Sequence, residues 1–379
     1  MGYMGTTMTN MQDMLWEKMG RGVFVVAELG KNFIQTEEER PVAEYLKNAK
    51  ELVREAKAAG ADAVKFQTHN VEDEQLATHV VAPHFSWDRH YWVTRNTKAT
   101  PLDAFWIPLK RFCDAEGITF FSTPMSRGAA EILSTVGVDL WKAGSCDLTD
   151  FVMLDYMRRS GKPIIISAGM STLEEVDAAV RFLKEKNDRV ALLHCVSKYP
   201  CPPEDLHLNT IGFFKERYRI PVGFSDHSIG IDSAFGAVAL GATIIEKHFS
   251  RARDLWGADH KVSMIPEEFA ALTGGIRVLA DKPEQRAAYL AHPTVKAGMG
   301  KAAKIMDPGE EKFRSVFRKC LMAGREIPAG TVITAEHLYA MRPFVHAGGI
   351  PSERYEEILG KKAARTLKKF DPITVSILT

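Results

Sequence analysis

The sequence lacks the features that mark secreted, membrane or nucleic-acid-binding proteins. Its five cysteines (Cys113, Cys146, Cys195, Cys201 and Cys320) are odd in number and include no CxxC pair, so neither a disulfide framework nor a zinc knuckle is expected. No apolar run approaches the roughly 20 residues that span a bilayer. The formal net charge is only +1, which argues against a nucleic-acid-binding surface. We therefore expect a cytoplasmic protein that binds neither nucleic acid nor membrane.

The amino-terminal stretch also lacks the basic start and the continuous apolar run of a signal peptide. We predict that residues 1–20 form a flexible tail. The whole chain has 379 residues, more than a typical single domain, so a large domain and a smaller one are expected.

A regular alternation fills the middle of the chain. Eight short apolar or β-branched runs are each followed by an amphipathic stretch with helical spacing. This count predicts a parallel sheet with helical crossovers that closes into a (β/α)8, or TIM, barrel over residues 21–290. An open doubly wound sheet is the alternative, but no GxGxxG follows the first run. The runs are VFVVAELG (23–30), AVKFQT (63–68), ITFFSTP (118–124), LWKAGS (140–145), PIIISAGM (163–170), RVALLHC (189–195), PVGFSDH (221–227) and TIIEKHFS (243–250).

Polar residues gather where these runs end, which is the end of a TIM barrel that carries the active site. Burying so many polar groups together is costly unless a ligand or a metal uses them. Two lysines with several hydroxyls suit a small phosphorylated anion, and His227 with His248 could share a divalent metal that keeps open positions. The residues are Glu28, Lys65, Gln67, Thr123, Lys142, Ser145, Ser167, His194, Ser225, Asp226, His227, Glu246 and His248.

Several motifs resemble those of a known family. VVAELGKN, GADAVKFQT, FFSTPMS, WKAGSCDLTD, IIISAGMSTLEEV, LLHCVSKYPCPPEDLHL, GFSDHSIG and IEKHFS are similar, in this order, to the motifs of the N-acetylneuraminate (sialic acid) synthase family. The tail SVFRKCLMAGREIPAGTVITAEHLYAMRP looks like the antifreeze-like SAF domain that ends these enzymes. The resemblance implies a linker over residues 291–312 and an SAF domain over residues 313–379.

The resemblance implies a reaction and a set of site residues. Phosphoenolpyruvate would condense with an N-acylated hexosamine, such as N-acetylmannosamine or a related deoxy or diamino sugar, to a nine-carbon 2-keto-3-deoxy acid and phosphate. His227 and His248 would bind Mn²⁺, with Mg²⁺ as an alternative. The implied catalytic residues are Glu28, Lys65, Lys142 and Asp147. Phosphoenolpyruvate would contact Lys65, Thr123, Lys142, Ser145, Ser167, Ser197 and Ser225, and the sugar would contact Glu28, Gln67, Tyr199, Asp259 and Arg342.

The resemblance further implies a domain-swapped homodimer. Arg342, in AMRP, matches the SAF-domain arginine that reaches a partner's active site, and the linker is long enough to cross to a neighbour. The alternative is that Arg342 pairs with a carboxylate inside its own small domain.

The chain also departs from the family pattern. Asp147 stands where a Glu is usual, Ser197 replaces an Asn, and Phe33 replaces a His, so the identity of the sugar is open. A phosphoenolpyruvate-dependent enzyme that uses an aldose phosphate is one alternative, although the strand ends supply no arginine for a second phosphate. A non-catalytic carbohydrate-binding protein is another. Residues 75–100, rich in aromatics, are interpreted as a lid, a dimer contact or a surface excursion.

Overall fold

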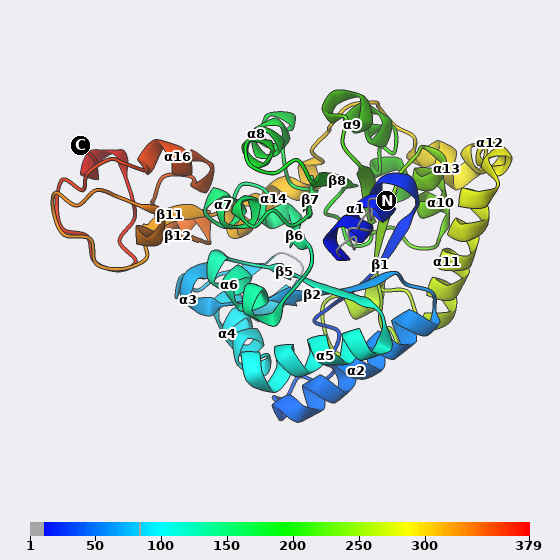
Figure 1. The fold of residues 1–379 in the computed structure, drawn as a ribbon, viewed down its shortest axis with the longest axis horizontal. Helices are drawn as coiled ribbons and strands as arrows, with labels where there is room; N and C mark the ends of the chain where they lie inside the picture. The colour runs from blue at the N-terminus through cyan, green and yellow to red at the C-terminus, as the bar shows by residue number, and fades with distance from the viewer. Residues whose placement is uncertain (1–10, 83–84) are drawn as a thin grey trace, which may run out of the picture.

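The computed structural model describes residues 11–82 and 85–379, and its main feature is a barrel of eight parallel strands (Figure 1). The strand order is β5-β2-β1-β10-β9-β8-β7-β6, so the first barrel strand pairs with the last and the ring is nearly closed, with a seam between β5 and β6. The TIM-barrel prediction is confirmed, and the open doubly wound sheet is wrong. The barrel strands are β1 (Phe24–Gly30), β2 (Ala63–Thr68), β5 (Thr119–Pro124), β6 (Trp141–Ala143), β7 (Ile164–Ser167), β8 (Val190–Cys195), β9 (Val222–Asp226) and β10 (Ile244–His248).

Helices surround the barrel, as Figure 1 shows. Their amphipathic faces pack onto the outward side chains of the strands in one continuous apolar core. The surrounding helices are α2 (Val42–Ala58), α5 (Ile107–Glu116, entered through one π-helical turn, Leu102–Trp106), α6 (Arg127–Val136), α7 (Phe151–Arg159), α8 (Leu173–Lys184), α9 (Thr210–Tyr218), α10 (Asp232–Ala239) and α11 (Pro266–Asp281). None of the described helices is both long and apolar enough to cross a membrane.

Side chains that point into the barrel change from apolar to polar along each strand. Because successive side chains of a strand face opposite sides, Phe24, Val26 and Glu28 share the inner face of β1. The first two belong to an apolar cluster in the barrel interior, and Glu28 lies at the cavity above it. The same parity directs His194 and Asp226 outward: His194 stacks on Phe224 at 5.8 Å between ring centroids. The expectation that these two residues face the barrel mouth is therefore wrong.

The amino-terminal segment is more ordered than the sequence predicted. Residues 1–10 lie outside the described residues, but α1 (Met11–Arg21) is a helix. Leu15 and Met19, one helical turn apart, are buried in the barrel-interior cluster with Phe24, so α1 covers the end of the barrel opposite the polar strand ends. The expected flexible tail is wrong for residues 11–20.

Two further parts of the chain lie beside the polar strand ends. One follows β2 and contains α3 (Val71–Glu74), β3 (Val81–Ala82), β4 (Phe85–Asp88) and α4 (Arg89–Ala99). The other follows α11 and contains α12 (Arg286–Leu290), α13 (Pro293–Gly298) and α14 (Pro308–Phe317). Short 3-10 turns occupy Ser145–Asp147, Pro203–Asp205, His260–Val262, Pro283–Gln285, Ala335–His337, Ser352–Arg354 and Val375–Ile377.

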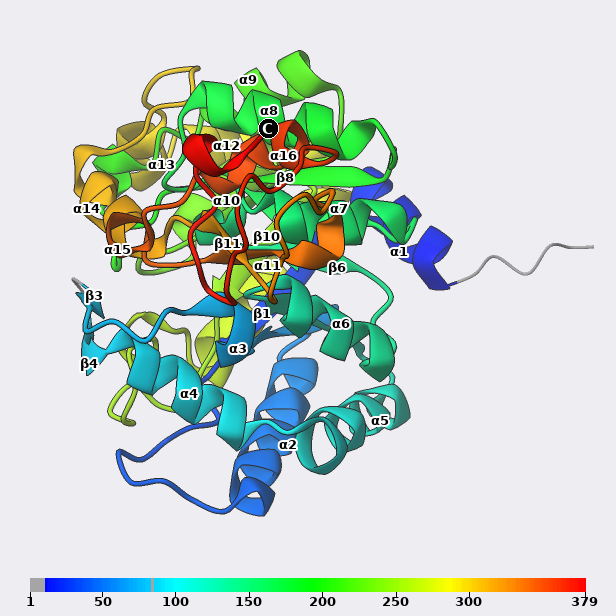
Figure 2. The same ribbon diagram turned by 90° about the vertical axis from the view of Figure 1, so that its left-hand side faces the viewer.

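The carboxy-terminal domain packs on the barrel of its own chain. It holds the antiparallel pair β11 (Cys320–Ala323) and β12 (Leu338–Met341), with α15 (Phe344–Ala347) and α16 (Tyr355–Ile358). Figure 2 shows this domain, in orange and red, lying across α7 and β6. Ion pairs and hydrogen bonds join it to the barrel, among them Arg158 to Glu356 at 2.8 Å and Ser352 Oγ to the Thr149 carbonyl at 2.7 Å.

Candidate active site

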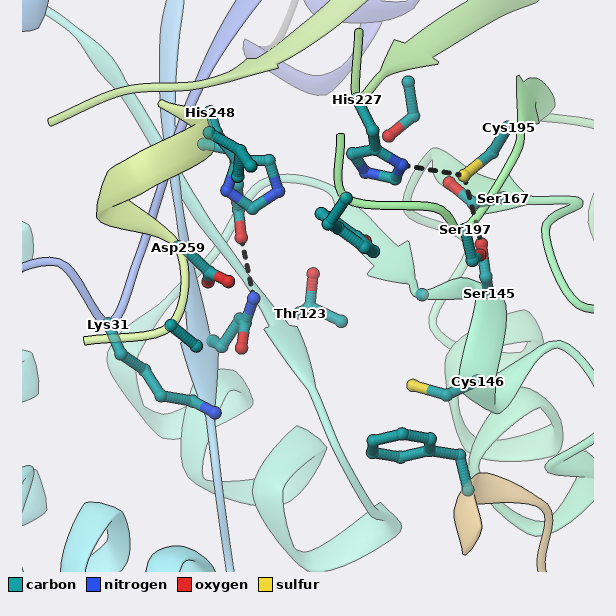
Figure 3. A pocket seen from close by; sticks show the side chains of 18 of the residues that line it. Lys31, Thr123, Ser145, Cys146, Ser167, Cys195, Ser197, His227, His248 and Asp259 are labelled. Carbon is teal, nitrogen blue, oxygen red and sulfur yellow. Dashed lines mark hydrogen bonds between the residues drawn. The ribbon is translucent and has the colours of Figure 1, made fainter. Parts of the chain in front are cut away.

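A cavity of about 470 Å³ opens at the carboxyl ends of the barrel strands. This volume lies within the range of pockets that hold small molecules. The cavity brings together all of the site residues that the family resemblance implied, except Asp147. Figure 3 shows His227 and His248 on one side, with Ser145, Ser167 and Ser197 opposite Asp259 and Lys31. The residues brought together are Glu28, Lys65, Gln67, Thr123, Lys142, Ser145, Ser167, Ser197, Tyr199, Ser225, His227, His248, Asp259 and Arg342.

Lys65 is the centre of a buried charge network at the bottom of the cavity. Its ammonium lies 2.7 Å from Glu28 and 3.4 Å from Glu246, and it donates to Thr123 Oγ1 at 3.2 Å. Glu28 also accepts a hydrogen bond from Gln67 at 2.9 Å. Because β1, β2 and β10 are neighbours in the sheet, their inward side chains meet here. The two carboxylates therefore compensate the Lys65 charge in the absence of a ligand.

The two carboxylates of this network have different proton affinities. Burial and the nearby Glu246 raise the pKa of Glu28 to about 7, although Lys65 opposes the shift. Burial acts in the same direction on Glu246, but Lys142 and Lys65 outweigh it and lower the pKa of Glu246 to about 2. Near neutral pH, Glu28 is therefore the carboxyl that takes up a proton, and the network then has a surplus positive charge for an anion.

A second lysine lies beside hydroxyl groups. Lys142 donates to Ser167 Oγ at 2.7 Å, and its distance to Glu246 is 3.9 Å, so its charge is less compensated than that of Lys65. Burial lowers the pKa of Lys142. Next to it, Gly169 donates its N–H to Ser145 Oγ at 3.1 Å. A Cβ at Gly169 would come within 2.4 Å of Ser197 Oγ and 2.6 Å of Ser145 Oγ, so only glycine leaves both hydroxyls in place.

His227 and His248 lie together with their rings 5.5 Å apart between centroids. Nδ1 of His227 is 2.8 Å from the Val196 carbonyl; a carbonyl only accepts, so Nδ1 carries the proton and the lone pair is on Nε2. Nδ1 of His248 is buried and has no hydrogen-bond partner within the described ranges. Burial, together with the charges of His227 and Lys65, lowers the pKa of His248 to about 4, so its ring is neutral at pH 7.

These two imidazoles fit a divalent metal. A neutral ring and an unpartnered buried nitrogen are what metal ligation requires. Although burial opposes it, the pKa of His227 is raised by Cys195 and by the Val196 carbonyl, so a metal would compete with protons for the Nε2 lone pair as pH falls. Residues 11–82 and 85–379 contain no cluster of three His, Cys, Asp or Glu side chains suited to an ion. Two protein ligands would leave several coordination positions for substrate and water.

Asp147 does not contact the cavity. Its carboxylate is fully buried and lies 2.6 Å from Arg342 Nη2 and 2.8 Å from Lys319 Nζ, both from the carboxy-terminal segment. These two cations outweigh burial and lower the pKa of Asp147 to about 2. The Asp side chain, which stands in place of the usual Glu, is therefore placed to hold Arg342, and the expected catalytic role of Asp147 stays a prediction.

Arg342 lines the cavity formed by the barrel of the same chain. The linker follows this barrel: Leu208 N donates to the Gly298 carbonyl at 2.8 Å, and Thr210 Oγ1 to the Ala303 carbonyl at 2.8 Å. In α14, Glu310 accepts from the backbone of Met170 and Ser197 at 2.8 and 2.7 Å. The alternative of a pair inside the small domain is wrong, because Arg342 pairs with Asp147 of the barrel, and the domain-swapped homodimer stays a prediction.

The insert after β2 forms a wall of the cavity, which favours the lid interpretation over a surface excursion. Arg95 lies against a cluster of tryptophans, with its guanidinium carbon 4.8 Å from the Trp256 ring centroid. Trp92 lies 5.7 Å from Trp256 and lines the cavity. The cluster holds α4 against the segment between β10 and α11, which also carries Asp259.

Several residues that line the cavity were missed from the sequence, among them the two cations Lys31 and Arg89. Lys31 directly follows β1 and lies one position beyond the predicted strand 23–30. The motif ELGKN therefore shows a lysine at the carboxyl end of this strand, where cavity residues are expected. Arg89 is the first residue of α4, in an insert that does not belong to the eight repeated units. No pattern in the sequence indicates that its side chain turns into the cavity.

The fold and the site define a class: a TIM-barrel enzyme whose strand ends hold a cationic pocket beside a pair of histidines, closed by a small carboxy-terminal domain. Models of the NeuB family and of the SAF domain match residues 52–285 and 318–376. The chain belongs to the NeuB family, and it is an enzyme of the sialic-acid-synthase type with an SAF domain.

Named relatives make different products. The chain is 33% identical to an uncharacterized protein of Methanocaldococcus jannaschii, over 93% of this chain and 94% of the relative. It is 30% identical to an N,N'-diacetyllegionaminic acid synthase of Campylobacter jejuni, over 85% and 92%. It is also 30% identical to the N-acetylneuraminate-9-phosphate synthase of Homo sapiens, over 92% and 91%.

Solved structures agree with this family. The spore coat polysaccharide biosynthesis protein spsE of Bacillus subtilis is 27% identical, with a TM-score of 0.73 over 94% of this chain and 95% of that one. An N-acetylneuraminic acid synthetase of Leptospira borgpetersenii, in complex with citrate, is 32% identical, with a TM-score of 0.59 over 72% and 92%.

Proposed function

We propose that this enzyme condenses phosphoenolpyruvate with an N-acylated hexosamine, to give a nine-carbon 2-keto-3-deoxy sugar acid and inorganic phosphate. The observation that carries the proposal is the meeting of Lys65, Lys142 and their hydroxyl neighbours with the pair His227 and His248 in one cavity. An anionic enol and an open-chain aldehyde need these two environments side by side.

The lysine end of the cavity suits phosphoenolpyruvate. Lys65 and Lys142 would bind its negative charges, and the hydroxyls of Thr123, Ser167 and Ser225 would orient them. Glu28 and Glu246 hold Lys65 in place until the anion arrives. Because the site is buried and preorganised, it can stabilise charge that develops when C3 of the enol attacks the aldehyde.

The histidine end suits the aldehyde of the acceptor. A divalent ion held by His227 and His248, Mn²⁺ or alternatively Mg²⁺, would supply Lewis-acid polarisation of the carbonyl oxygen. Gln67, Tyr199 and Asp259 would contact the acceptor's polar groups. After the carbon–carbon bond forms, water adds to the cationic C2, and the tetrahedral centre collapses by cleaving the bond between C2 and the phosphate oxygen.

Burial favours this proposal over a non-catalytic sugar-binding protein. The departures at Asp147 and Ser197 favoured such a protein in the sequence, but Asp147 supports Arg342, and Ser197 keeps its hydroxyl beside Ser145 at Gly169. A binding module would not need two lysines and two glutamates buried beneath the sugar site, because desolvating these charges costs several kcal/mol each.

A phosphate-release assay tests the proposal. Purified protein with phosphoenolpyruvate, Mn²⁺ and N-acetylmannosamine, its 6-phosphate or diamino analogues should release phosphate and form a 2-keto acid in equal amounts. The matched control is Lys142→Met, which should bind the sugar and release none. Phosphate release without any sugar, or only with aldose phosphates that lack an N-acyl group, would contradict the proposal.

A further inference from the structure

Two cations that line the outer end of the cavity and are at least half-buried have no ion-pair partner among the described residues; a third lining cation, Lys261, is exposed. Lys31 is half-buried, and Arg89 is 6% exposed; both line the cavity. Nε of Arg89 is buried and makes no hydrogen bond to the described residues. Aromatic rings lie against both charges: the Trp92 ring centroid is 5.4 Å from Lys31 Nζ, and the Phe317 ring centroid is 5.0 Å from the guanidinium carbon of Arg89.

The protein bears an electrostatic cost for these two charges. Burial, together with Arg89, lowers the pKa of Lys31 to about 8; burial, together with Arg342, lowers the pKa of Arg89 to about 10. Arg89 also occupies the first position of α4, an eleven-residue helix, where the helix dipole disfavours a cation. Lys65 differs from both, because two carboxylates lie within 3.4 Å of it.

The nearest carboxylates are engaged elsewhere. Glu74 lies 2.7 Å from His69 Nδ1, and Asp147 is held by Arg342 and Lys319. Asp259 lies between His248 and Lys31 in Figure 3, on the acceptor side of the cavity. The electrostatic complement that Lys31 and Arg89 lack is therefore an anion from outside the protein.

We propose that Lys31 and Arg89 form a second anion site, which binds a phosphate group of the acceptor sugar at the end remote from its aldehyde. The inference rests on the proposed function, because the aldehyde end is assigned to His227 and His248. Figure 3 shows Lys31 and these histidines at separate ends of the cavity with Asp259 between them, the arrangement that an extended open-chain sugar phosphate would span.

A phosphate monoester matches the site better than a carboxylate. It carries close to two negative charges near neutral pH, which equals the charge of the two cations. The guanidinium offers a fork of donors and the ammonium a point charge, the usual combination for phosphate. A carboxylate would leave one buried positive charge uncompensated. The strand ends supply no arginine for a second phosphate; Arg89, at the start of α4 in the insert after β2, supplies one.

Acceptor kinetics test the inference. With phosphoenolpyruvate and Mn²⁺, the wild-type enzyme should have a kcat/KM for N-acetylmannosamine 6-phosphate about a hundredfold above that for N-acetylmannosamine. Lys31→Met and Arg89→Met should each reduce this preference by about tenfold or more. The KM for phosphoenolpyruvate should change less than about threefold. Lys184→Met, on the exposed face of α8, removes a positive charge far from the cavity and should change nothing.

Several outcomes would overturn the inference. These are a wild-type preference for the neutral sugar, a rise in the KM for phosphoenolpyruvate as large as the loss with the sugar phosphate, or better turnover of an acceptor with a carboxylate in place of the phosphate. If neither of these sugars nor a diamino analogue is turned over, the proposed function fails. Calorimetric titration of the sugar phosphate then decides the inference separately: binding that Lys31→Met abolishes supports it, and no binding in the wild-type protein refutes it.

Discussion

The two ends of the cavity are built in different ways. At the inner end, Lys65, Lys142, Glu28 and Glu246 project from four strands of the barrel and compensate one another. At the outer end, Lys31, Arg89 and Arg342 come from a loop, an inserted helix and the SAF domain. The inner end is therefore fixed by the barrel strands, whereas the outer end is assembled from three separate parts of the chain. We expect the inner end to bind phosphoenolpyruvate and the outer end to select the acceptor.

Removing the histidine pair should have the largest effect on activity. His227→Ala or His248→Ala should reduce turnover by about a thousandfold or more, because the acceptor carbonyl would lose its Lewis acid. Electron paramagnetic resonance of added Mn²⁺ should show that the bound signal is lost, while circular dichroism remains that of the wild type. Full activity after thorough chelation, with metal analysis confirming removal, would contradict the metal assignment.

Substitutions of Lys142 and Lys65 should differ in their effects on phosphoenolpyruvate binding and on the free energy of unfolding. Lys142→Met should reduce kcat/KM for phosphoenolpyruvate by about a hundredfold with little loss of stability, since Lys142 has only a distant carboxylate. Lys65→Met leaves Glu28 and Glu246 buried without their cation, and should lower the free energy of unfolding by about 3–5 kcal/mol. Denaturant titrations of both variants check this difference. Equal stability of the two would contradict the inner-network description.

Substitutions of Arg342 test the ion pair that joins the SAF domain to Asp147 of the barrel. Arg342→Ala should lower the free energy of unfolding by about 3 kcal/mol, because Asp147 would keep only Lys319 as its buried partner. Arg342→Lys retains the charge but not the guanidinium fork, and should recover most of the stability. The measurement is urea denaturation of the two variants and Lys319→Met. An Arg342→Ala protein as stable as the wild type would show that the ion pair is not formed in solution.

Glu28 should give the smallest effect, a change in the pH profile. Its folded-state pKa of about 7 is above its usual value of 4.5, so its contribution to stability is present at low pH and is lost as pH rises from about 4.5 to 7. Over the same range its carboxylate becomes available to acceptor hydroxyls, and activity should rise by a few-fold to about tenfold up to pH 8. In Glu28→Gln both dependences should disappear. An unchanged acidic limb in that variant would assign the titration to another group.

The residues of the inner end were predictable because the side chains of a strand point to the same face at every second residue. The alternation that places Glu28, Lys65 and Ser225 on the inner face of the barrel places His194 and Asp226 on the outer face. The sequence alone was therefore enough to exclude these two residues from the cavity. Likewise, the spacing of Leu15 and Met19 is one helical turn and indicated α1. The barrel and the strand-end side chains follow from local periodicity alone.

The outer end was not predictable in the same way. That Asp147 meets Arg342 depends on how two domains dock across 195 residues of sequence separation, and no local pattern encodes such a contact. Arg89 is one of many charged residues in its insert, and only packing on the tryptophan cluster turns α4 toward the cavity. The resemblance to a family indicated an arginine in the SAF domain and assigned it to the active site of a partner subunit, but it did not indicate the contact between Arg342 and Asp147 of the same chain.

Glu310 has a consequence for how the protein unfolds. Its carboxylate accepts backbone hydrogen bonds from the loops after β7 and β8, while Lys319 and Arg342 bury their charges against the barrel. Detaching the SAF domain together with α14 would leave the Met170 and Ser197 N–H groups without the Glu310 carboxylate, and would leave Asp147 without a cation. The two domains should therefore melt as one cooperative unit: differential scanning calorimetry should give a single transition whose calorimetric and van't Hoff enthalpies agree, in place of the two separate transitions typical of domains joined only by a linker.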